Sequence, residues 1–578
     1  MSNSHTKEIN TQIVISLLKS HGIRKVITSP GGTNIAFVGS IQKDPFFEIY
    51  SSVDERSAAY MACGMAEDSG EPVVISCTGA TAARNYISGL TEAYYRNLPI
   101  LALTSTQDVA KVGHHIAQVT DRSSMQNDIV NLSVTLPIVK DDDDIWDCEI
   151  KVNQAILELK RKNGGPVHIN VPTKYTLPFE NKVLPNYRVI KRITKQDKLP
   201  QLEGKVAVFI GSHKKFTSDE TKTLDEFCLR NNAVVFCDHT SGYKGKYRLL
   251  FSLLAAQDKM DKSAFKPDTL IHIGDISGDY PTLGLSGHKV WRVNEDGEIR
   301  DTFRKLHYVF EMTEKDFFSS YCGGTTNDDS YFQKCEDRLN EIRISIPELP
   351  FSNIWAASIV APQIPPGSTV HLGILSSLRS WNYFNVAEGV HTASNVGGFG
   401  TDGCLSSLIG ASLNHSERLY FCVLGDQAFF YDMNVMGNRH VGNNLRILVI
   451  NNGIGAEFKR YNSAAAYFED DADEFIAAAK HFGNKSPLLI KNYSENLGFE
   501  YLSASNKSEL NNVLTRFVNS EITNQSMVLE IFTDSRDESK AIELINSTVK
   551  ESKSTLKAGM KKILGQSGVN LVKQIAKK

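Results

Sequence analysis

The sequence lacks the features that mark zinc-binding, disulfide-stabilised, membrane-spanning and secreted proteins. Its nine cysteines are scattered, mostly within apolar runs, and none forms a Cys-x-x-Cys pair. Reduced thiols in protein cores are therefore expected, not a zinc site or a disulfide framework. No apolar run approaches the ~20 residues that span a bilayer, and the N-terminus lacks the charged-then-apolar plan of a signal peptide. We predict a soluble, cytoplasmic protein.

The chain also lacks an excess of charge of either sign. Its 63 basic and 66 acidic residues give a formal net charge of −3, which provides no broad attraction for nucleic acid or for an anionic surface. Hydrophobic residues make up 41% and charged residues 22%, as is ordinary for globular proteins. At 578 residues the chain exceeds the size at which one hydrophobic core stops growing, so two or more domains are expected.

Two short apolar runs, at 419–424 and 447–450, each end abruptly at a polar pair. The first run ends at Gly425-Asp426 and the second at Asn451-Asn452. Unbroken apolar runs of this length are typical of strands buried on both faces of a parallel sheet. Parallel neighbours need a crossover, usually a helix, which residues 429–441 can supply. The two polar pairs are therefore predicted to lie side by side at the carboxyl ends of adjacent strands, where open α/β sheets bind ligands.

The donors at these strand ends favour a hard cation bound together with phosphate. Asp426 offers a carboxylate oxygen and Asn452 an amide oxygen, and oxygen ligands of this kind suit Mg²⁺. A helix that starts near Gln427 would direct free backbone N–H groups at the same place, as anion sites require. A metal-bound diphosphate is one interpretation. Two ordinary strand-end turns are the alternative.

The first third of the chain alternates strands, turns and helices. Apolar runs predict five strands, and small or polar turns follow several of them, which is the mark of a doubly wound parallel sheet. The predicted strands are 25–28, 49–53, 72–77, 99–104 and 166–171, and the turns include SPGGTN at 29–34, DER at 54–56 and TGATAARN at 78–85.

These motifs, in this order, resemble the thiamine diphosphate (ThDP) enzymes. The resemblance rests on SPGG, on DER before an alanine-rich helix, on TGATAARN, on GPVHINVP, and on Gly-Asp followed about two dozen residues later by Asn-Asn. The resemblance spans about residues 1–540. Of the family's branches, the chain is most similar to the menaquinone-pathway SEPHCHC (2-succinyl-5-enolpyruvyl-6-hydroxy-3-cyclohexene-1-carboxylate) synthases. This resemblance implies three doubly wound parallel-sheet α/β domains: pyrimidine-binding (1–187), central (190–345) and diphosphate-binding (350–546), with a basic tail at 547–578.

The resemblance also implies which residues hold the cofactor. Asp426, Asn452 and the backbone carbonyl of Ile454 match the positions that bind the metal. Thr401 departs from the family, which usually has a bulky apolar residue there to wedge the cofactor into its bent form. The other positions implied to contact ThDP are Gly31, Thr78, Gly373, Gly400, Asp402, Ser407, Gly425, Gln427 and Ala428.

Glu55 matches the position of the family's cofactor-activating glutamate. A carboxyl group at the far pyrimidine nitrogen provides the proton that makes the reactive tautomer of the cofactor available, which calls for a buried carboxyl with a raised pKa. The alternative is that Glu55 is an ordinary acid in the first turn of a helix, where it offsets the helix dipole.

Substrate contacts are implied in two further regions. His114, His115 and Gln118 lie in a segment from which family members direct histidine or glutamine side chains at the substrate; solvated histidines are the alternative. Arg379 matches a substrate arginine of the synthases, whereas Thr33, Val396 and the segment TSTQD at 104–108 stand where those enzymes carry others. Since arginine pairs bidentately with carboxylates, these departures favour a smaller or less charged donor, such as pyruvate.

The function implied is ThDP- and Mg²⁺-dependent decarboxylation of a 2-oxo acid, with transfer of the resulting acyl-anion equivalent to an acceptor. A simple 2-oxo acid decarboxylase, which the histidine pair favours, is one alternative; a non-catalytic binding module that kept the fold is another. The resemblance further implies a homodimer or homotetramer, because in this family two subunits build each active site.

Three other segments carry expectations of their own. The GDISG turn at 274–278 lacks the GxGxxG spacing of a nucleotide site, which favours a structural turn. The acidic run at 141–144 is predicted to be a solvated loop tip. The tail at 555–578 has six lysines, no acids and spaced apolar residues. We interpret it as a solvated helix or as an amphipathic helix with weak contact to an anionic membrane surface.

Overall fold

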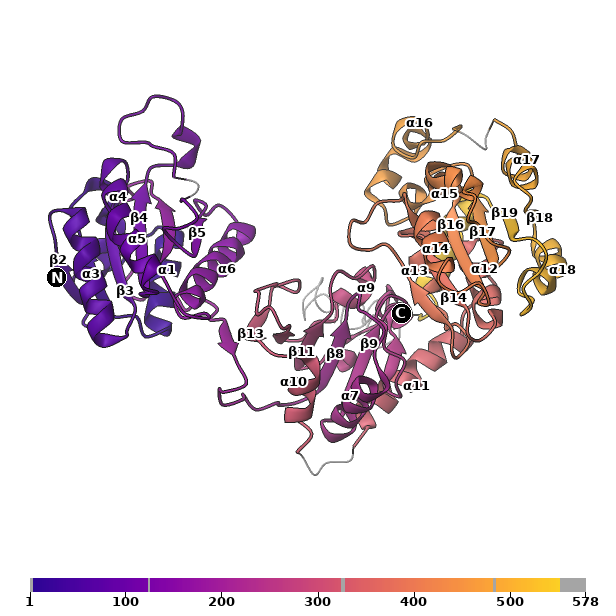
Figure 1. Cartoon of the computed structure of the whole chain (residues 1–578), viewed down its shortest axis with the longest axis horizontal. Coiled ribbons are helices and arrows are strands. Elements are labelled where there is room, and N and C mark those ends of the chain that lie inside the picture. Colours follow the sequence, from indigo (N-terminus) through magenta and orange to yellow (C-terminus); the bar gives the residue numbers. More distant parts are fainter. Residues whose placement is uncertain (1–3, 123–124, 324–327, 482–484, 551–578) are drawn as a thin grey trace, which may run out of the picture. The chain divides into compact units, whose positions relative to one another are not determined.

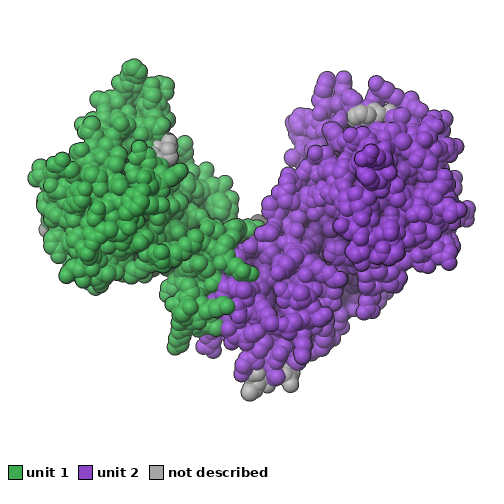
Figure 2. Space-filling view, in the orientation of Figure 1, with its two compact units in different colours: residues 1–199, 295–311 green, residues 200–294, 312–578 purple. Residues whose placement is uncertain are grey.

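The computed structural model describes residues 4–122, 125–323, 328–481 and 485–550. The chain forms two compact units, coloured separately in Figure 2: unit 1 holds residues 1–199 and 295–311, and unit 2 holds residues 200–294 and 312–578. Each unit is described by itself. The three-domain limits drawn from the sequence remain predictions, as does the membrane contact of the tail, which lies outside the described residues.

Unit 1 contains a six-stranded, all-parallel sheet in the order β2-β1-β3-β4-β6-β5. Its strands are β1 (Lys25–Thr28), β2 (Glu48–Ser51), β3 (Val73–Thr78), β4 (Ile100–Thr106), β5 (Leu132–Thr135) and β6 (Val167–Pro172). Unit 1 also contains the parallel neighbours β7 (Lys191–Ile193) and β13 (Leu306–Phe310). The helices are α1 (Ile9–Ser20), α2 (Ile35–Ile41), α3 (Glu55–Ser69), α4 (Thr81–Asn85), α5 (Ile87–Tyr95) and α6 (Asp142–Glu158), with 3-10 turns η1 (Gly32–Asn34) and η2 (Val109–Lys111).

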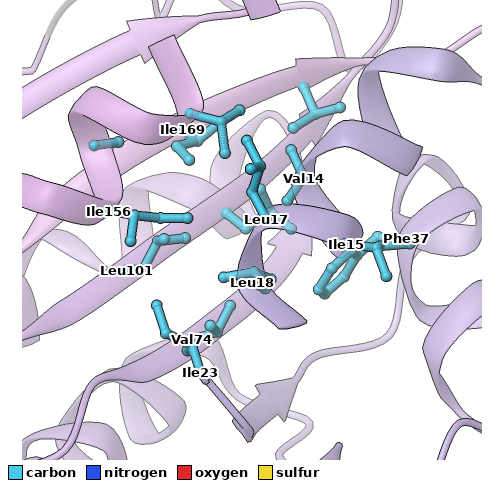
Figure 3. Packing of buried hydrophobic residues seen from close by; sticks show 14 of the residues in the cluster. Val14, Ile15, Leu17, Leu18, Ile23, Phe37, Val74, Leu101, Ile156 and Ile169 are labelled. Atoms are coloured by element: carbon cyan, nitrogen blue, oxygen red, sulfur yellow. The ribbon is translucent and has the colours of Figure 1, made fainter. Parts of the chain in front are cut away.

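Helices cover both faces of this sheet, because alternate strand residues point to opposite sides. On one face, Val74 and Leu101 pack with Leu17 of α1 and Ile156 of α6 (Figure 3). On the other face, residues next to these in sequence pack against α3 and α5. The central strands β3, β4 and β6 are buried on both sides, which explains why they read as continuous apolar runs, whereas the edge strands β2 and β5 are partly exposed.

Helices α3 and α5 pack so closely that the contact position on α5, Gly89, has no room for a side chain. A Cβ atom added at Gly89 of α5 would lie 2.4 Å from the Cβ of Ala59 and 3.0 Å from its backbone carbon. Gly89→Ala is therefore expected to lower the free energy of unfolding by about 1–3 kcal/mol through overpacking, as measured by urea denaturation. Gly64→Ala on α3 is the matched control, since nothing lies within 4 Å of its added Cβ; we expect it to stabilise by about 0.5–1 kcal/mol. Equal effects of the two substitutions would contradict the packing argument.

Unit 2 contains two parallel sheets (Figure 1). In the first, five strands follow the order β10-β9-β8-β11-β12: β8 (Val206–Ile210), β9 (Ala233–Cys237), β10 (Arg248–Leu250), β11 (Thr269–Ile273) and β12 (Lys289–Val293). The second has the order β15-β14-β16-β17-β19-β18: β14 (Thr369–Leu372), β15 (His391–Ala393), β16 (Tyr420–Gly425), β17 (Leu445–Asn451), β18 (Glu500–Ala504) and β19 (Met527–Phe532). With the sheet of unit 1, these confirm the predicted fold class.

Short helices and 3-10 turns connect the strands of unit 2. Around the first sheet lie α7 (Ser218–Arg230), α8 (Ser252–Ala255), η3 (Ser263–Phe265), α9 (Tyr280–Leu283), α10 (Glu314–Ser320) and α11 (Ser330–Ile344). Around the second lie α12 (Asn353–Val360), η4 (Ala361–Gln363), α13 (Ser376–Trp381), α14 (Cys404–Ser412), α15 (Asp426–Asp432), η5 (Met433–Gly437), η6 (Ala456–Lys459), η7 (Ala464–Asp471), α16 (Ala472–Phe475), α17 (Leu489–Asn496), α18 (Lys507–Phe517) and α19 (Ser535–Asn546).

The acidic run at 141–144 is not a loop tip. Asp141 caps helix α6 by accepting hydrogen bonds from the backbone N–H groups of Asp143 (3.0 Å) and Asp144 (3.1 Å), and the next acids form the first helical turn. The prediction was wrong because adjacent acids are favoured at a helix N-terminus, where they meet free N–H groups and the positive end of the helix dipole.

Two expectations drawn from absences can be compared with the structure. All nine thiols are free, and eight of them are buried, as expected for reduced cysteines in protein cores. Across the described residues, the structure contains no helix with the length and apolar character needed to cross a membrane.

Candidate functional site

The strand ends that carry Asp426 and Asn452 meet at one edge of the second sheet of unit 2. Strands β16 and β17 are parallel neighbours, with Gly425 opposite Ile450. The crossover begins earlier than predicted: α15 starts at Asp426 itself, ends at Asp432 and continues as η5 to Gly437. The Asp426 carboxylate is only 5% exposed, and its Oδ2 accepts a hydrogen bond from the backbone N–H of Gly453 (3.0 Å). The two polar turns are therefore in direct contact.

The two asparagines of the second turn have different partners. Asn451 donates from Nδ2 to Oε1 of the buried Glu530 (2.6 Å), which also accepts a hydrogen bond from the Tyr501 hydroxyl (2.8 Å). Asn452 is half-buried, and its side-chain oxygen accepts a hydrogen bond from the backbone N–H of Ile454 at 3.3 Å. Asn451 is thus fixed inside the sheet, and Asn452 is the one that remains at its edge beside Asp426.

The chemistry of this edge fits a divalent cation. Burial raises the pKa of Asp426 to about 7, because the charged form is desolvated and only backbone N–H groups compensate it. No lysine, arginine or histidine in the described parts of unit 2 forms an ion pair with it. A metal ion bound to the carboxylate, the Asn452 oxygen and the Ile454 carbonyl would supply the missing positive charge. All three are oxygen donors, as Mg²⁺ prefers.

The predicted cofactor residues of unit 2 surround the same edge. Gly425 directly precedes α15, with Ala428 half-buried in its first turn. The Gln427 amide donates to the carbonyls of Ala477 and Ala478, at 3.4 Å each, so it ties the turn to the 477–478 segment. Gly373 follows β14, where an added Cβ would lie 3.2 Å from the Val423 carbonyl oxygen.

The glycine-rich loop before α14 is anchored through Asn395. This side chain donates to the Gly403 carbonyl and to the Ser407 hydroxyl, both at 3.0 Å, and its oxygen contacts the His371 Nε2 at 3.0 Å. Gly400, Thr401 and Asp402 are exposed. The loop is therefore held at its base and by α14, while the residues predicted to contact the cofactor face outward.

Glu55 is the first residue of α3 in unit 1, directly after the helix cap Asp54. It is half-buried in the chain, and its Oε2 accepts a weak hydrogen bond from the Asn85 Nδ2 at 3.4 Å. The deep burial expected for a proton-donating carboxyl is not provided by unit 1 alone. Its position after an edge strand of the sheet explains this, since no further strand covers that side.

Thr33 lies inside unit 1. It is 4% exposed, and its hydroxyl donates to the Ser105 carbonyl (2.8 Å) and contacts the Thr78 hydroxyl. Gly31 is required beside them, because an added Cβ would lie 2.5 Å from the Thr78 Cβ. Thr33 therefore joins η1 to the ends of β3 and β4, and its role toward a substrate remains a prediction.

The segment with His114, His115 and Gln118 is a loop between η2 and β5, and all three residues are exposed. His115 and Gln118 adopt positive φ values of 54° and 62°, which are uncommon for non-glycine residues. The structure does not bring these side chains together with another predicted residue through a hydrogen bond.

Arg122 is a functional candidate that sequence reasoning missed. Its side chain reaches Gly79 of the TGATAARN turn, where an added Cβ would meet Nη1 at 2.7 Å. The residue is 6% exposed; Nη2 donates to the Asn170 side-chain oxygen (3.1 Å), whereas Nε and Nη1 have no hydrogen-bond partner within the described chain. Burial lowers the pKa of this arginine. The only sequence signal was a basic residue four positions after Gln118.

Arg379 lines a cavity of about 590 Å³ in unit 2. It lies on α13 and forms an ion pair with Glu457 of η6, which also pairs with Arg460 at 3.2 Å. The Arg379 guanidinium lies over the Tyr280 ring, with its Cζ 4.8 Å from the ring centroid. Glu457 and Tyr280 were not predicted, because each contacts Arg379 across a long stretch of sequence. Arg460 was not predicted either, although it pairs with Glu457 only three residues away.

Comparison with known proteins finds one matching family model and several relatives that this chain resembles. Residues 10–125 match the family model described as "Thiamine pyrophosphate enzyme, N-terminal TPP binding domain". Three similar curated proteins are named 2-succinyl-5-enolpyruvyl-6-hydroxy-3-cyclohexene-1-carboxylate synthase. The Bacteroides fragilis protein is 28% identical (92% of this chain, 97% of the relative), that of Phocaeicola vulgatus 29% (90% and 95%) and that of Flavobacterium johnsoniae 26% (90% and 95%). Together these findings support a thiamine diphosphate enzyme that is similar to these synthases over most of its length.

Proposed function

We propose that this protein uses ThDP and Mg²⁺ to decarboxylate a 2-oxo acid and to transfer the resulting acyl-anion equivalent to an acceptor. The observation that carries the proposal is the Asp426 carboxylate, which is buried, uncompensated by any cation of the described chain and in contact with the Asn452–Ile454 turn. Without a metal this arrangement costs free energy, since a buried charge needs a partner. The similarity to the synthases named above supports the same reaction class.

Residues of both units would contribute to catalysis. Asp426, Asn452 and the Ile454 carbonyl would hold Mg²⁺, and Gly425 and Gln427 adjoin the diphosphate. Glu55 would exchange a proton with the pyrimidine nitrogen. When bound, ThDP would supply a carbon nucleophile for the 2-oxo group and an acceptor for the electron pair left behind when CO₂ departs. The residues around the cavity then hold the donor and the acceptor.

The exposed surface around Glu55 supports assembly of two or more copies. Val53 is 79% exposed, and Tyr60 and Met61 on α3 are 48% and 42% exposed. A second copy over these apolar side chains would bury them and complete the burial that Glu55 needs as a proton donor. We propose a homodimer or homotetramer in the cytoplasm, with active sites between subunits.

The test is CO₂ release from a panel of 2-oxo acids. With ThDP and Mg²⁺ present, we expect turnover of at least one acid, and we expect chelation with EDTA to abolish it and Mg²⁺ to restore it. No CO₂ from any acid would contradict the proposed function and would favour a non-catalytic binding module.

Product analysis of the same reactions separates the two enzymatic candidates. A synthase yields a carbon–carbon coupled product when an aldehyde, ketone or activated alkene acceptor is added, whereas a simple decarboxylase releases the aldehyde whether or not an acceptor is present. The exposed pair His114 and His115 is the observation that favours the second candidate, because histidine can protonate a carbanion equivalent.

A further inference from the structure

The cavity around Arg379 adjoins the proposed metal turn. Its lining includes Glu457, Phe458 and Arg460, and the 3-10 turn η6 (Ala456–Lys459) begins two residues after Ile454. Arg379 enters from α13 and Tyr280 from α9. A ligand in this cavity would therefore lie next to the diphosphate end of the cofactor.

Glu457 is the centre of a charge cluster in this cavity. One carboxylate oxygen contacts Nη1 of Arg379; the other accepts from Nη2 of Arg460 (3.2 Å) and from the Ser376 hydroxyl (3.2 Å). The side chains are largely buried, at 20% exposure for Arg379, 20% for Glu457 and 12% for Arg460. The Glu457 carboxylate thus forms ion pairs with two guanidinium groups. Because these side chains have little contact with solvent, their ion pairs are only weakly screened.

The cluster has one positive charge more than it has negative charges. The shortage of hydrogen-bond acceptors is visible at Arg460, whose buried Nε has no hydrogen-bond partner among the described residues. Burial lowers the pKa of Arg460, as expected for a guanidinium that is incompletely paired. A second anion is the group that would complete the cluster.

Two further carboxyl groups lie near the cluster, Asp279 in the cavity lining and Glu538 close to Arg460, and each adds a negative charge when it is ionised. Burial raises the pKa of Asp279 to about 6. Asp279 caps α9 by accepting from the backbone N–H and hydroxyl of Thr282 (3.2 and 2.6 Å). Glu538 accepts from the Asn353 N–H and the Thr533 hydroxyl (2.9 and 2.7 Å), and burial raises its pKa to about 7.

Lys262 and Asp258 line the outer part of the cavity and bring one charge of each sign. The pKa of Lys262 is lowered by burial, and Asp258 opposes that shift. Together they leave the excess of positive charge around Glu457 unchanged.

We propose that Glu457 restricts this cavity to ligands with a single carboxylate. With Glu457 in place, two arginines and one carboxylate leave room for one further negative charge, which a monocarboxylic 2-oxo acid supplies. A dicarboxylic acid would bring a second negative charge toward Glu457 and would be repelled. Glu457 is a specificity-determining residue in this account, and the inference rests on the proposed function.

The test compares a monocarboxylic and a dicarboxylic 2-oxo acid, pyruvate and 2-oxoglutarate, on the full chain loaded with ThDP and Mg²⁺. In the natural protein we expect kcat/KM to favour pyruvate by at least about 10-fold, or 1.4 kcal/mol. In Glu457→Gln we expect this ratio to fall at least about 10-fold, mainly through a lower KM for 2-oxoglutarate. An unchanged ratio, or a natural preference for the dicarboxylic acid, would overturn the proposal.

Two further variants distinguish a change in charge from a loss of folding. Glu457→Asp keeps the charge and should retain the preference for pyruvate. The double variant Arg379→Gln with Glu457→Gln restores the original charge excess and should return the ratio toward its natural value. A double variant that behaves like Glu457→Gln alone would also count against the charge argument.

A binding readout separates this inference from the proposed function. Thermal shifts of the same variants with acetate and with succinate report on anion binding without turnover. If no acid releases CO₂ but Glu457→Gln raises the succinate shift relative to the acetate shift, the proposed function fails and the role of Glu457 stands. If CO₂ is released, but Glu457→Gln changes neither the kcat/KM ratio of the two acids nor the ratio of the succinate and acetate thermal shifts, then only the role of Glu457 is contradicted.

Discussion

Glu55→Gln is expected to lower the rate of CO₂ release by about 10²–10⁴-fold, the range that general acid–base catalysis contributes. Glutamine has the size of glutamate but cannot exchange a proton, so the pyrimidine would lose the activating partner that we propose for it. Because the Glu55 side chain is half-buried and, within the described residues, makes one weak hydrogen bond, to Asn85, the fold should persist. The measurements are steady-state kinetics with saturating ThDP and thermal unfolding of the same sample.

The neighbouring Asp54 provides the control. It caps α3 by accepting from the Arg56 N–H (3.2 Å) and the Ser57 hydroxyl (2.8 Å). Asparagine is an equally good cap, so Asp54→Asn should retain near-normal turnover. Normal activity in Glu55→Gln would show that Glu55 merely offsets the helix dipole.

Asp426→Asn is expected to have opposite effects on the empty and the loaded protein. The variant should lose most of its affinity for Mg²⁺ with ThDP, and its turnover with it, because the only anionic ligand of the site is gone. At pH 8, without cofactor, it should unfold at a higher temperature than the natural protein. Calorimetry with and without Mg²⁺ and ThDP measures both effects.

The sign of the stability effect follows from the pKa of Asp426, which burial raises from 3.8 to about 7. A carboxyl whose pKa is higher in the folded state penalises folding once it must ionise. The penalty is absent below the unfolded value and complete above about pH 7, so the cofactor-free natural protein should lose stability across that window. Each unit of pKa corresponds to about 1.4 kcal/mol, and Asp426→Asn should abolish this pH dependence.

Asn452→Ala is the matched control for the metal site. It removes a neutral ligand, so metal affinity should fall without any gain in cofactor-free stability. If Asp426→Asn still responds to Mg²⁺ and ThDP as the natural protein does, then the metal does not bind at this turn.

Much of the fold could be predicted because buried parallel strands appear as unbroken apolar runs. Strands β3, β4, β16 and β17 were located to within a residue or two at most ends for that reason. Short edge strands such as β5, with its half-exposed LSVT sequence, lack the run and were missed. The acidic run at 141–144 was misread since a helix cap and a loop tip share the same composition.

The candidate site could be predicted only where a motif is local. Asp426 and Asn452 follow recognisable strands, and the contact between Asp426 and Gly453 agrees with the expected adjacency. The pairing of Arg379 with Glu457 joins residues 78 positions apart, and no local pattern encodes it. The burial of Arg122 beside Gly79 likewise depends on packing between separate loops.

The short distance along the chain between Ile454 and Glu457 has a kinetic consequence. A cation that lands on the Ile454 carbonyl would fix the start of η6, and three residues later the same stretch presents the carboxylate that screens incoming acids. Coenzyme loading and substrate discrimination would then be coupled through this one short stretch, so the rate at which acids bind should depend on whether the coenzyme is present.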